Sequence, residues 1–273
     1  MTTDVRRLAV PPKPRRPRAL LGAGVLAAAL VVAHVIAWDA TDFSPAALAD
    51  GWTGMADFLG EAFPPDLSWG VLGPSLEAAL VTLWIGLLGT TLSIPFALAL
   101  ALLAARGTTP SGWIYQLARS VLSFLRAVPE VVFALIFVTA VGLGPFPGVL
   151  ALVFHNVGVM GKLWAEAIED ADPGPATALR SAGASRVQVA THALLPLVTP
   201  QLFGLLLYRF DVNVRSSLVL GLVGAGGIGF LINQSIKLFR FDQMLTHILV
   251  VLVLIILVDQ LSALVRRRLG DNA

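Results

Sequence analysis

EAIEDADPGPATALRSAGASRVQVATHALLP, from Glu166 to Pro196, is the only long polar interruption in the apolar second half of the chain. It contains several acids, two arginines, an internal Gly183 and a closing Leu195-Pro196. The segments on both sides are apolar enough to cross a bilayer. A soluble-looking helical stretch between two membrane spans predicts a contact surface for a cytoplasmic partner.

The composition around this stretch is that of a membrane protein. Of the 273 residues, 56% are hydrophobic and 13% are charged, whereas a soluble domain is about a quarter charged. Apolar runs of about 18 to 25 residues recur, which is typical of membrane-spanning helices. We therefore predict an all-α polytopic membrane protein with one domain. The chain has no cysteine, which excludes disulfides, thiol nucleophiles and cysteine metal sites.

Apolar runs and basic clusters divide the chain into five predicted regions. They are a basic, proline-rich cytoplasmic tail (1–18), a first transmembrane helix (19–38), an extracytoplasmic amphipathic segment (39–72), a core (73–265) that contains the 166–196 stretch, and a cytoplasmic C-terminal tail (266–273). Five further spans are predicted within the core, at 75–105, 129–141, 149–164, 197–220 and 244–265. We also expect a kink at Pro95, a short interfacial helix within 107–126 and a tight turn at 142–148.

Positive charge gathers on one side of these spans. Six spans place both termini on the same side, and 15 of the 19 Lys and Arg residues fall there. Segment 39–72 carries six acids and no Lys or Arg. Because cytoplasmic loops are enriched in Lys and Arg, both termini and the 166–196 stretch are predicted to be cytoplasmic. Segment 39–72 is then an interfacial amphipathic helix, or alternatively a small extracytoplasmic cap.

Charged residues within spans four and five are candidates for a translocation path. In span five, Asp211 and Arg215 form one i,i+4 pair, and Arg209 and Asn213 form another. Charges inside the membrane usually face a bundle interior or an aqueous path. Two interpretations stay open: a structural ion-pair network between helices, and a polar lining that passes an anionic solute. The candidate path residues are Arg209, Asp211, Asn213, Arg215, His155 and Asn156.

The fourth span also presents a polar face made of His155, Lys162, Glu166 and Glu169. A His/Glu metal site is conceivable there, but the four histidines of the chain are scattered along it. We therefore predict no metal site. A polar face packed against the path or against a partner subunit is the favoured interpretation.

The sequence from Gly224 to Gly229 formally matches the G-x-G-x-x-G pattern. A dinucleotide site needs this pattern after a strand of a βαβ unit, and here it follows a membrane span. The glycines Gly224, Gly226, Gly227 and Gly229 are therefore predicted to allow close helix packing or a broken helix, as gate or packing positions. No P-loop, H-E-x-x-H or Ser-His-Asp spacing is present, so we predict no catalytic residues. We expect no cofactor on this chain, and active transport would need ATP bound by another polypeptide.

The 166–196 stretch itself has the pattern of two short helices joined at a glycine. Asp172-Pro-Gly-Pro175 breaks the chain, a helix is predicted over 176–182, and 183–185 is a turn with Ser185 as an N-cap. A second helix is predicted over 186–193, and Pro196 is expected to end it before span five. Such a compact pair of helices fits a groove on a partner.

These residues resemble the membrane permeases of bacterial ABC importers, whose shared pattern is E-A-A, three residues, G, nine residues, I-x-L-P. Thr177-Ala178-Leu179 takes the E-A-A place, Gly183 has the required spacing, and Ala193-Leu-Leu195-Pro196 stands for I-x-L-P. Thr177 thus replaces the glutamate and Ala193 the isoleucine. The ATPase-coupling residues that the resemblance implies are Thr177, Ala178, Leu179, Arg180, Gly183, Ala184, Ser185, Arg186, Leu195 and Pro196.

Further motifs over roughly residues 75–265 resemble the phosphonate-type branch of this family. They are Arg126-Ala-Val-Pro129, Gly142-Leu-Gly-Pro145, Gly161-Lys162, Glu166-Ala-Ile-Glu169, Gly183-Ala-Ser185, Asn213-Val-Arg215 and Gly221-Leu-Val-Gly-Ala-Gly-Gly-Ile-Gly229. The resemblance implies six transmembrane helices of the type I ABC importer kind, a bacterial plasma-membrane location, and import of phosphonates or related phosphorus oxyanions by alternating access.

The same resemblance implies the partners of the chain. They are a second copy of the chain, a cytoplasmic ATPase dimer that holds ATP and magnesium, an external substrate-binding protein and the lipid bilayer, with no nucleic acid. An ABC permease for another small solute, such as an amino acid or a metal chelate, is the nearer alternative. A channel that works without partners, or a membrane enzyme, is the more distant one.

Overall fold

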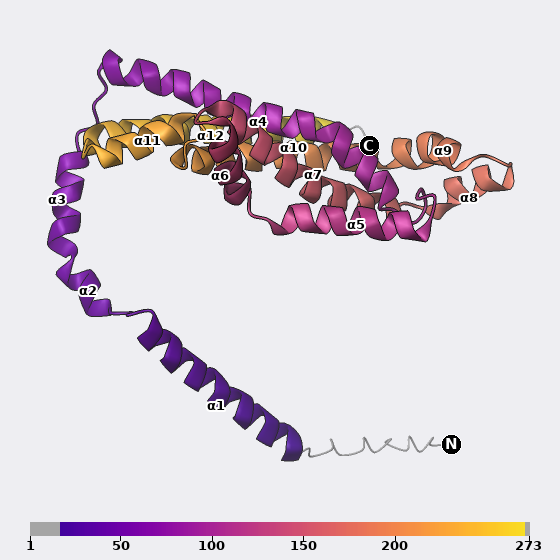
Figure 1. Ribbon diagram of the computed structural model, residues 1–273, viewed down its shortest axis with the longest axis horizontal. Helices are drawn as coiled ribbons and strands as arrows, with labels where there is room; N and C mark the ends of the chain where they lie inside the picture. The colour runs from indigo at the N-terminus through magenta and orange to yellow at the C-terminus, as the bar shows by residue number, and fades with distance from the viewer. Residues whose placement is uncertain (1–16, 271–273) are drawn as a thin grey trace, which may run out of the picture. The chain divides into compact units, whose positions relative to one another are not determined.

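The computed structural model describes the backbone of residues 17–270 and the side chains of residues 22–265. Nearly all of the predicted basic tail (1–18) therefore lies outside the described residues, as do residues 271–273. Within the described range the regular structure is helical, without a strand (Figure 1). The described residues divide into two units, one that ends at residue 57 and one that begins at residue 58.

The first unit contains α1 (Pro17–Ala40), α2 (Pro45–Asp50) and the start of α3 (Trp52–Ala62). In the part of α1 whose side chains are described, apolar side chains lie on every face and His34 and Asp39 are the polar ones; Val25 and Ile36 are 68% and 62% exposed. A helix of 24 residues that is apolar all round has the length and surface of a span that faces lipid.

The segment predicted as one amphipathic helix consists of two short helices, α2 and α3, and an extended stretch after them. α3 ends at Ala62 because Pro64 and Pro65 lack the N–H donors that a further turn would need. α4 (Trp69–Leu103) begins before the predicted start at residue 75 and continues through Pro74 and Pro95. The kink expected at Pro95 stays a prediction.

The second unit is a bundle with α7 (Pro145–Glu169) at its centre (Figure 1). α7 packs on α4, α5 (Gly112–Ala127) and α6 (Glu130–Val141). Small residues allow this close approach: a Cβ added to Gly161 of α7 would lie 2.5 Å from Cδ2 of Leu122 in α5.

The remaining helices of the bundle pack on α4, and α10 (Leu195–Leu222) also packs on α7. α11 (Ile228–Lys237) and α12 (Phe241–Gly270) pack on each other, on α10 and on α4. Three helices from distant parts of the sequence, α4, α7 and α10, therefore meet in the interior.

The described part of the chain contains five helices that are long and apolar enough to cross a membrane, and a sixth candidate span in a bent pair. The third predicted span, 129–141, corresponds to α6, which is too short to be a full span by itself. α6 has 12 residues and rises about 18 Å, which is short of the ~30 Å hydrocarbon core. α5 and α6 together form the bent pair, at 84°. The bend falls at Val128, which is extended because the residue before a proline disfavours the helical conformation.

The turn predicted over 142–148 is also shorter in the structure. Residues 142–144 connect α6 to α7, with φ values of 94° at Gly142 and 140° at Gly144. Pro145 and Pro147 lie in the first turn of α7, where an N–H has no acceptor within the helix. These prolines therefore start the helix, whereas the sequence-based prediction placed them before it.

Pro196 does not end a helix, contrary to the prediction. The chain is helical without interruption through α9 (Arg186–Val189), the π-helical turn η1 (Ala190–Leu194) and α10. The N–H of Leu195 donates to the carbonyl of Ala190, five residues back. Because Pro196 has no N–H for the carbonyl of His192, the wider π turn accommodates the missing bond and the ring. The end of the polar stretch is therefore continuous with a span.

Candidate functional site

We define the coupling unit as residues 173–194, which comprise α8 (Pro173–Ser181), a turn, α9 and η1. It lies at one end of the bundle (Figure 1). Asp172 caps α8, because its Oδ1 accepts a hydrogen bond of 2.9 Å from the N–H of Gly174. Residues 166–169 belong to the end of α7, so the coupling unit is shorter than the polar stretch that predicted it.

A glycine in the left-handed region sets the turn between α8 and α9. Gly183 has a φ of +85°, which other residues adopt at a cost because of their Cβ. The N–H of Ala184 donates to the carbonyl of Leu179 at 3.0 Å and closes α8. Ser185 then starts α9 with a capping box, in which the Gln188 side chain accepts from the N–H of Ser185 at 2.8 Å. The predicted N-cap at Ser185 is confirmed.

We expect Ser185→Ala to loosen α9 without changing the rest of the coupling unit. The loss of an N-cap costs about 1 kcal/mol, so amide exchange within 186–189 should become about fivefold faster. Hydrogen exchange followed by mass spectrometry measures this change in the membrane-embedded protein. Ser181→Ala is the matched control, since the Ser181 hydroxyl only donates to the Thr177 carbonyl within α8. Equal exchange in wild type and Ser185→Ala would contradict the assigned cap.

The coupling unit contains no acidic residue, and its exposed positions include small and apolar side chains. Thr177, at the position where the family pattern has glutamate, donates its hydroxyl to the Pro173 carbonyl at 2.7 Å. Thr177 and Ala178 are exposed, and Val187 of α9 is 72% exposed. The sequence did not single out Val187, because one valine in a short helix gives no periodic signal.

Both arginines of the coupling unit bind the linker between α4 and α5, which comprises residues 104–111. Arg180 Nη2 donates to the carbonyl of Gly107 at 3.0 Å. Arg186 Nη1 donates to the carbonyls of Thr109 and Pro110 at 3.0 and 2.5 Å. The sequence suggested that these arginines would contact a partner protein. In the structure their hydrogen bonds hold the coupling unit against the linker.

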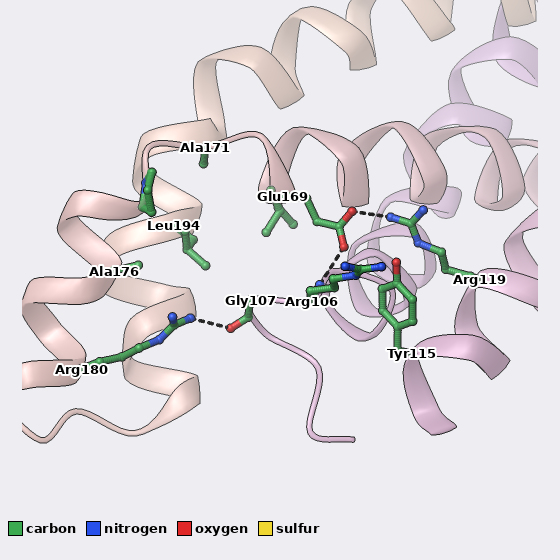
Figure 2. A pocket seen from close by; sticks show the side chains of 11 residues that line it. Arg106, Gly107, Tyr115, Arg119, Glu169, Ala171, Ala176, Arg180 and Leu194 are labelled. Carbon is green, nitrogen blue, oxygen red and sulfur yellow. Dashed lines mark hydrogen bonds and ion pairs between the residues drawn. The ribbon is translucent and has the colours of Figure 1, made fainter. Parts of the chain in front are cut away.

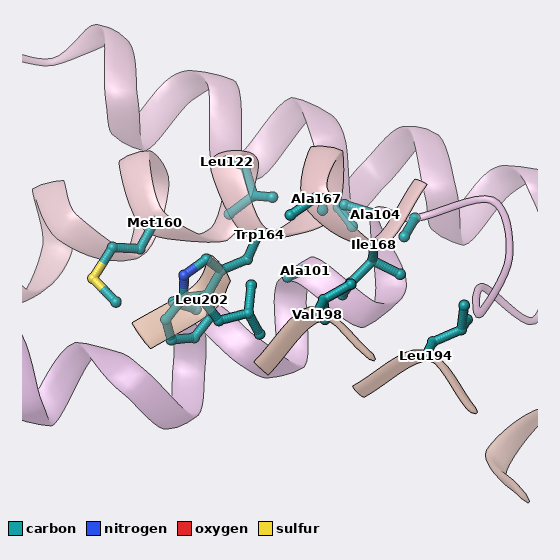
Figure 3. Close-up of a cluster of buried hydrophobic side chains, with 14 of the residues drawn as sticks. Ala101, Ala104, Leu122, Met160, Trp164, Ala167, Ile168, Leu194, Val198 and Leu202 are labelled. Atoms are coloured by element: carbon teal, nitrogen blue, oxygen red, sulfur yellow. The ribbon is translucent and has the colours of Figure 1, made fainter. Parts of the chain in front are cut away.

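A single hydrophobic cluster continues from the coupling unit into the spans (Figure 3). Ala176 and Leu194 belong to the same buried cluster as Ala104 of the linker, Leu122 of α5 and Ile168 of α7. Closely packed interiors transmit displacement. A movement of the coupling unit therefore displaces the ends of α4, α5 and α7 together.

A cavity of about 430 Å³ lies between the coupling unit, the linker, α5 and the end of α7 (Figure 2). Glu169 Oε2 accepts from Arg119 Nη2 at 2.6 Å, and its Oε1 accepts from the backbone N–H of Arg106 at 2.9 Å. The guanidinium groups of Arg106 and Arg119 lie 5.6 and 5.0 Å from the ring centroid of Tyr115. The Tyr115 hydroxyl, as a hydrogen-bond acceptor, raises the pKa of Arg106 above its usual range, and the negative charge of Glu169 adds to this effect. The Arg106 side chain therefore stays cationic.

The predicted path residues Arg209, Asn213 and Asn156 meet in a buried network between α4, α7 and α10. Arg209 is 7% exposed and donates through Nε to Asn156 Oδ1 at 2.8 Å and through Nη2 to Asn213 Oδ1 at 3.2 Å. Asn213 donates in turn to Thr90 Oγ1 of α4 at 2.7 Å. The i,i+4 contact between Arg209 and Asn213 is confirmed, whereas the partners Asn156 and Thr90 come from other spans.

Asp211 and Arg215 form a separate pair on another face of α10. Arg215 Nη2 lies 2.9 Å from Asp211 Oδ2 and 3.7 Å from Asp259 Oδ1 of α12. This predicted pair is also confirmed. Oδ1 of Asp211 is buried and has no hydrogen-bond partner among residues 22–265. Arg215 therefore links α10 to α12 through Asp259, and Asp211 Oδ1 can still accept a hydrogen bond.

His155 stands apart from the network that holds its neighbour Asn156. Its Nδ1 lies 3.1 Å from the carbonyl of Val128, and its Nε2 lies 3.6 Å from Glu130 Oε2. Glu169 faces Arg119 instead, so the helical face predicted from His155 to Glu169 is divided between two sites. Among the described residues, no group of three or more His, Cys, Asp or Glu side chains is placed to hold a metal ion.

The glycine-rich segment forms the loop between α10 and α11 and the start of α11. Gly224, Gly226 and Gly227 have positive φ values, and Gly229 lies inside α11. α10 and α11 touch at Gly221, where an added Cβ would lie 2.8 Å from the Cα of Gly229. The N–H of Ile228 donates to Thr82 Oγ1 of α4 at 2.9 Å, which holds this loop on the bundle.

Known structures of ABC transporters share this helical bundle. One of them is described as an inward-facing conformation of the MetNI methionine ABC transporter; it has a TM-score of 0.60 and 20% identity, over 73% of this chain and 96% of that chain. This chain and that one therefore share a fold.

The family is shown by sequence. Residues 97–271 match the family model described as "Binding-protein-dependent transport system inner membrane component", and the chain belongs to this family. It is 43% identical to the "Phosphite transport system permease protein PtxC" of Stutzerimonas stutzeri over 81% of this chain and 79% of that protein. It is 41% identical to the "Phosphate-import permease protein PhnE" of Mycolicibacterium smegmatis over 87% of this chain and 44% of that longer protein.

Proposed function

We propose that this chain is the membrane-spanning subunit of an ATP-driven importer for phosphorus oxyanions, namely phosphite, phosphonates or phosphate. The observation that carries the proposal is the 43% identity, over 81% of the chain, to a permease named for phosphite transport. A second relative, at 41% identity, is named for phosphate import. These solutes share a tetrahedral phosphorus centre with negatively charged oxygens, so one kind of path serves them all.

The buried network supplies a cation where such a solute has to cross. Arg209 is the fifteenth residue of α10, which places it near the middle of a 28-residue helix. Its guanidinium binds neutral amide oxygens of Asn156 and Asn213 rather than a carboxylate. A guanidinium that keeps its positive charge unpaired attracts an oxyanion, and its planar donors match oxyanion geometry. We assign Arg209 to the path and Asp211–Arg215 to its edge.

The coupling unit provides the mechanical input. It extends as one helix from Arg186 into α10, which carries Arg209, and it shares its buried cluster with α4, α5 and α7. In this proposal two copies of the chain dock on a cytoplasmic ATPase dimer through Thr177, Ala178 and Val187. ATP-driven closure of the ATPases displaces both coupling units, and the spans then expose the path to an external binding protein. Both termini lie in the cytoplasm in this arrangement.

A measurement of ATPase stimulation tests this function. The chain is purified with its ATPase in lipid nanodiscs, and the binding protein of the same transport system is added with phosphite, methylphosphonate, phosphate or methionine. We expect ATP hydrolysis to rise with the phosphorus oxyanions and to stay basal with methionine. Stimulation by methionine alone would support an amino-acid permease. Failure of the chain to copurify with any ATPase would contradict the proposal.

A further inference from the structure

We propose that the cavity of Figure 2 is a second anion site, in which Arg106, Arg119 and Arg180 bind a phosphorus oxyanion at the cytoplasmic end of the bundle. This site is separate from Arg209, which lies inside α10. The shared ligand chemistry is a tetrahedral phosphorus centre with charged oxygens. Its source is either free oxyanion in the cytoplasm or the phosphate of a phospholipid headgroup.

The charges of the cavity favour an anion. Three guanidinium groups line it together with a single carboxylate, Glu169, so the lining carries a net formal charge of +2. Glu169 is already occupied by Arg119 and by the backbone N–H of Arg106. Among residues 22–265, Arg106 and Arg180 form no ion pair with a carboxylate. Their positive charge is therefore available to a ligand.

The cavity also has the donors and the size for such a ligand. Arg180 uses one N–H on the carbonyl of Gly107, and the guanidinium of Arg106 lies over the Tyr115 ring without a carbonyl acceptor among the described residues. Planar guanidinium groups with remaining N–H donors bind phosphate-type oxygens in bidentate fashion. A volume of about 430 Å³ falls within the range of small-ligand sites and accommodates inorganic phosphate or a lipid headgroup.

A ligand in this cavity would connect segments of the chain that are separate in sequence. Arg180 comes from the coupling unit, Arg106 from the linker and Arg119 from α5 (Figure 2). An oxyanion that contacts all three adds ionic bonds between the coupling unit and the bundle. The identity of the oxyanion as a transported solute rests on the proposed function, whereas the site itself rests on these side chains.

Binding of inorganic phosphate to the complete complex tests the free-anion source. The permease–ATPase complex is placed in phosphatidylcholine nanodiscs without nucleotide or binding protein, and ³²P-phosphate binding is followed by equilibrium dialysis. Arg106→Gln keeps the backbone N–H that Glu169 accepts and removes only the charged side chain. We expect its affinity to fall about tenfold or more, as the loss of a charge-assisted hydrogen bond predicts. Arg106→Lys, which keeps the charge, should lose less.

A second arm tests the headgroup source, and a control separates both from general charge effects. The complexes are exchanged into nanodiscs that contain phosphatidylglycerol, and the retained lipid is counted by native mass spectrometry. Loss of retained phosphatidylglycerol in Arg106→Gln, with no phosphate binding in the first arm, would assign the site to lipid. Lys237→Gln removes an exposed charge away from the cavity and should match wild type in both arms.

The proposal is overturned if Arg106→Gln and wild type bind phosphate equally and also retain phosphatidylglycerol equally. Uptake assays keep this result distinct from the proposed function. A wild-type complex that binds phosphate through Arg106 and imports no phosphorus oxyanion would leave the site standing and remove the transport assignment. A complex that imports oxyanion but binds phosphate and lipid equally with and without the Arg106 side chain would leave the transport assignment standing and remove the second anion site.

Discussion

Arg209→Met is expected to lower uptake of phosphorus oxyanions about a hundredfold or more while the complex still assembles. Arg209 is 7% exposed, and among residues 22–265 its guanidinium donates to amide oxygens alone, so its charge is desolvated and without a carboxylate partner there. The charge-assisted hydrogen bonds that a guanidinium gives to an oxyanion contribute about 1.5–3 kcal/mol each, so the loss of two corresponds to about 10² to 10⁴ in rate or affinity. Uptake by proteoliposomes measures the loss, and gel filtration and thermal unfolding measure assembly.

Two companion variants distinguish a path from a purely structural network. Arg209→Lys keeps the charge but loses the planar fork, so we expect it to retain part of the uptake. Arg215→Gln removes a half-exposed arginine whose partners are Asp211 and Asp259, and it should have a smaller effect than Arg209→Met. Normal uptake in an assembled Arg209→Met complex would contradict the path assignment. Lost assembly in both Arg209 variants would assign the network to structure alone.

Gly183→Val is expected to uncouple ATP hydrolysis from transport. Gly183 has a φ of +85° and no atom within 4 Å of an added Cβ, so the backbone conformation is the only obstacle to a side chain. A residue with a Cβ in this region costs about 1–2 kcal/mol, and a β-branched one is a rare outlier. We therefore expect stimulation of ATPase by the loaded binding protein, and uptake with it, to fall about tenfold, with insertion and basal hydrolysis retained.

The controls for this variant isolate the conformation of the turn. Gly112→Val places the same side chain at an exposed glycine that also has open space around its Cβ but no positive φ, and it should behave like wild type. Gly183→Asn should recover much of the coupling, because asparagine tolerates the left-handed region. Normal stimulation and uptake in Gly183→Val would show that the turn does not couple the two proteins.

Local patterns predicted local contacts well. The pairs Asp211–Arg215 and Arg209–Asn213 follow from i,i+4 spacing on one helix, and both are present. The N-cap at Ser185 follows from a serine after a glycine turn. The fold class follows from long apolar runs, since a bilayer leaves helices as the simple solution for them.

Contacts between helices were not predictable from the same patterns. Arg209 binds Asn156, which is 53 residues away, and Asn213 binds Thr90, which is 123 residues away. Only the packing of α4, α7 and α10 brings them together. Arg106 and Arg119 entered the sequence-based argument as counts of positive charge and Arg180 as a coupling residue, and no spacing indicated that the three line one cavity with Glu169.

The boundaries that were wrong share a physical cause, which is the position of proline. Pro196 was expected to stop a helix, but a π turn absorbs its missing N–H and the helix continues. Pro129 was placed at the start of span three, and it is the N-cap of α6, next to the bend that separates this short helix from α5. Pro145 and Pro147 were placed in a turn, but they begin α7. In each case the tertiary setting decides whether proline starts, bends or ends a helix.

ATP-dependent accumulation of labelled phosphite in proteoliposomes tests the central claim most directly. The vesicles contain the permease with its ATPase, and the loaded binding protein is added on the external side. We predict accumulation that requires ATP and the binding protein, that phosphate or methylphosphonate inhibits, and that methionine leaves unchanged. Absence of accumulation by an assembled, ATP-hydrolysing complex, or its inhibition by methionine instead of the phosphorus oxyanions, would contradict the account.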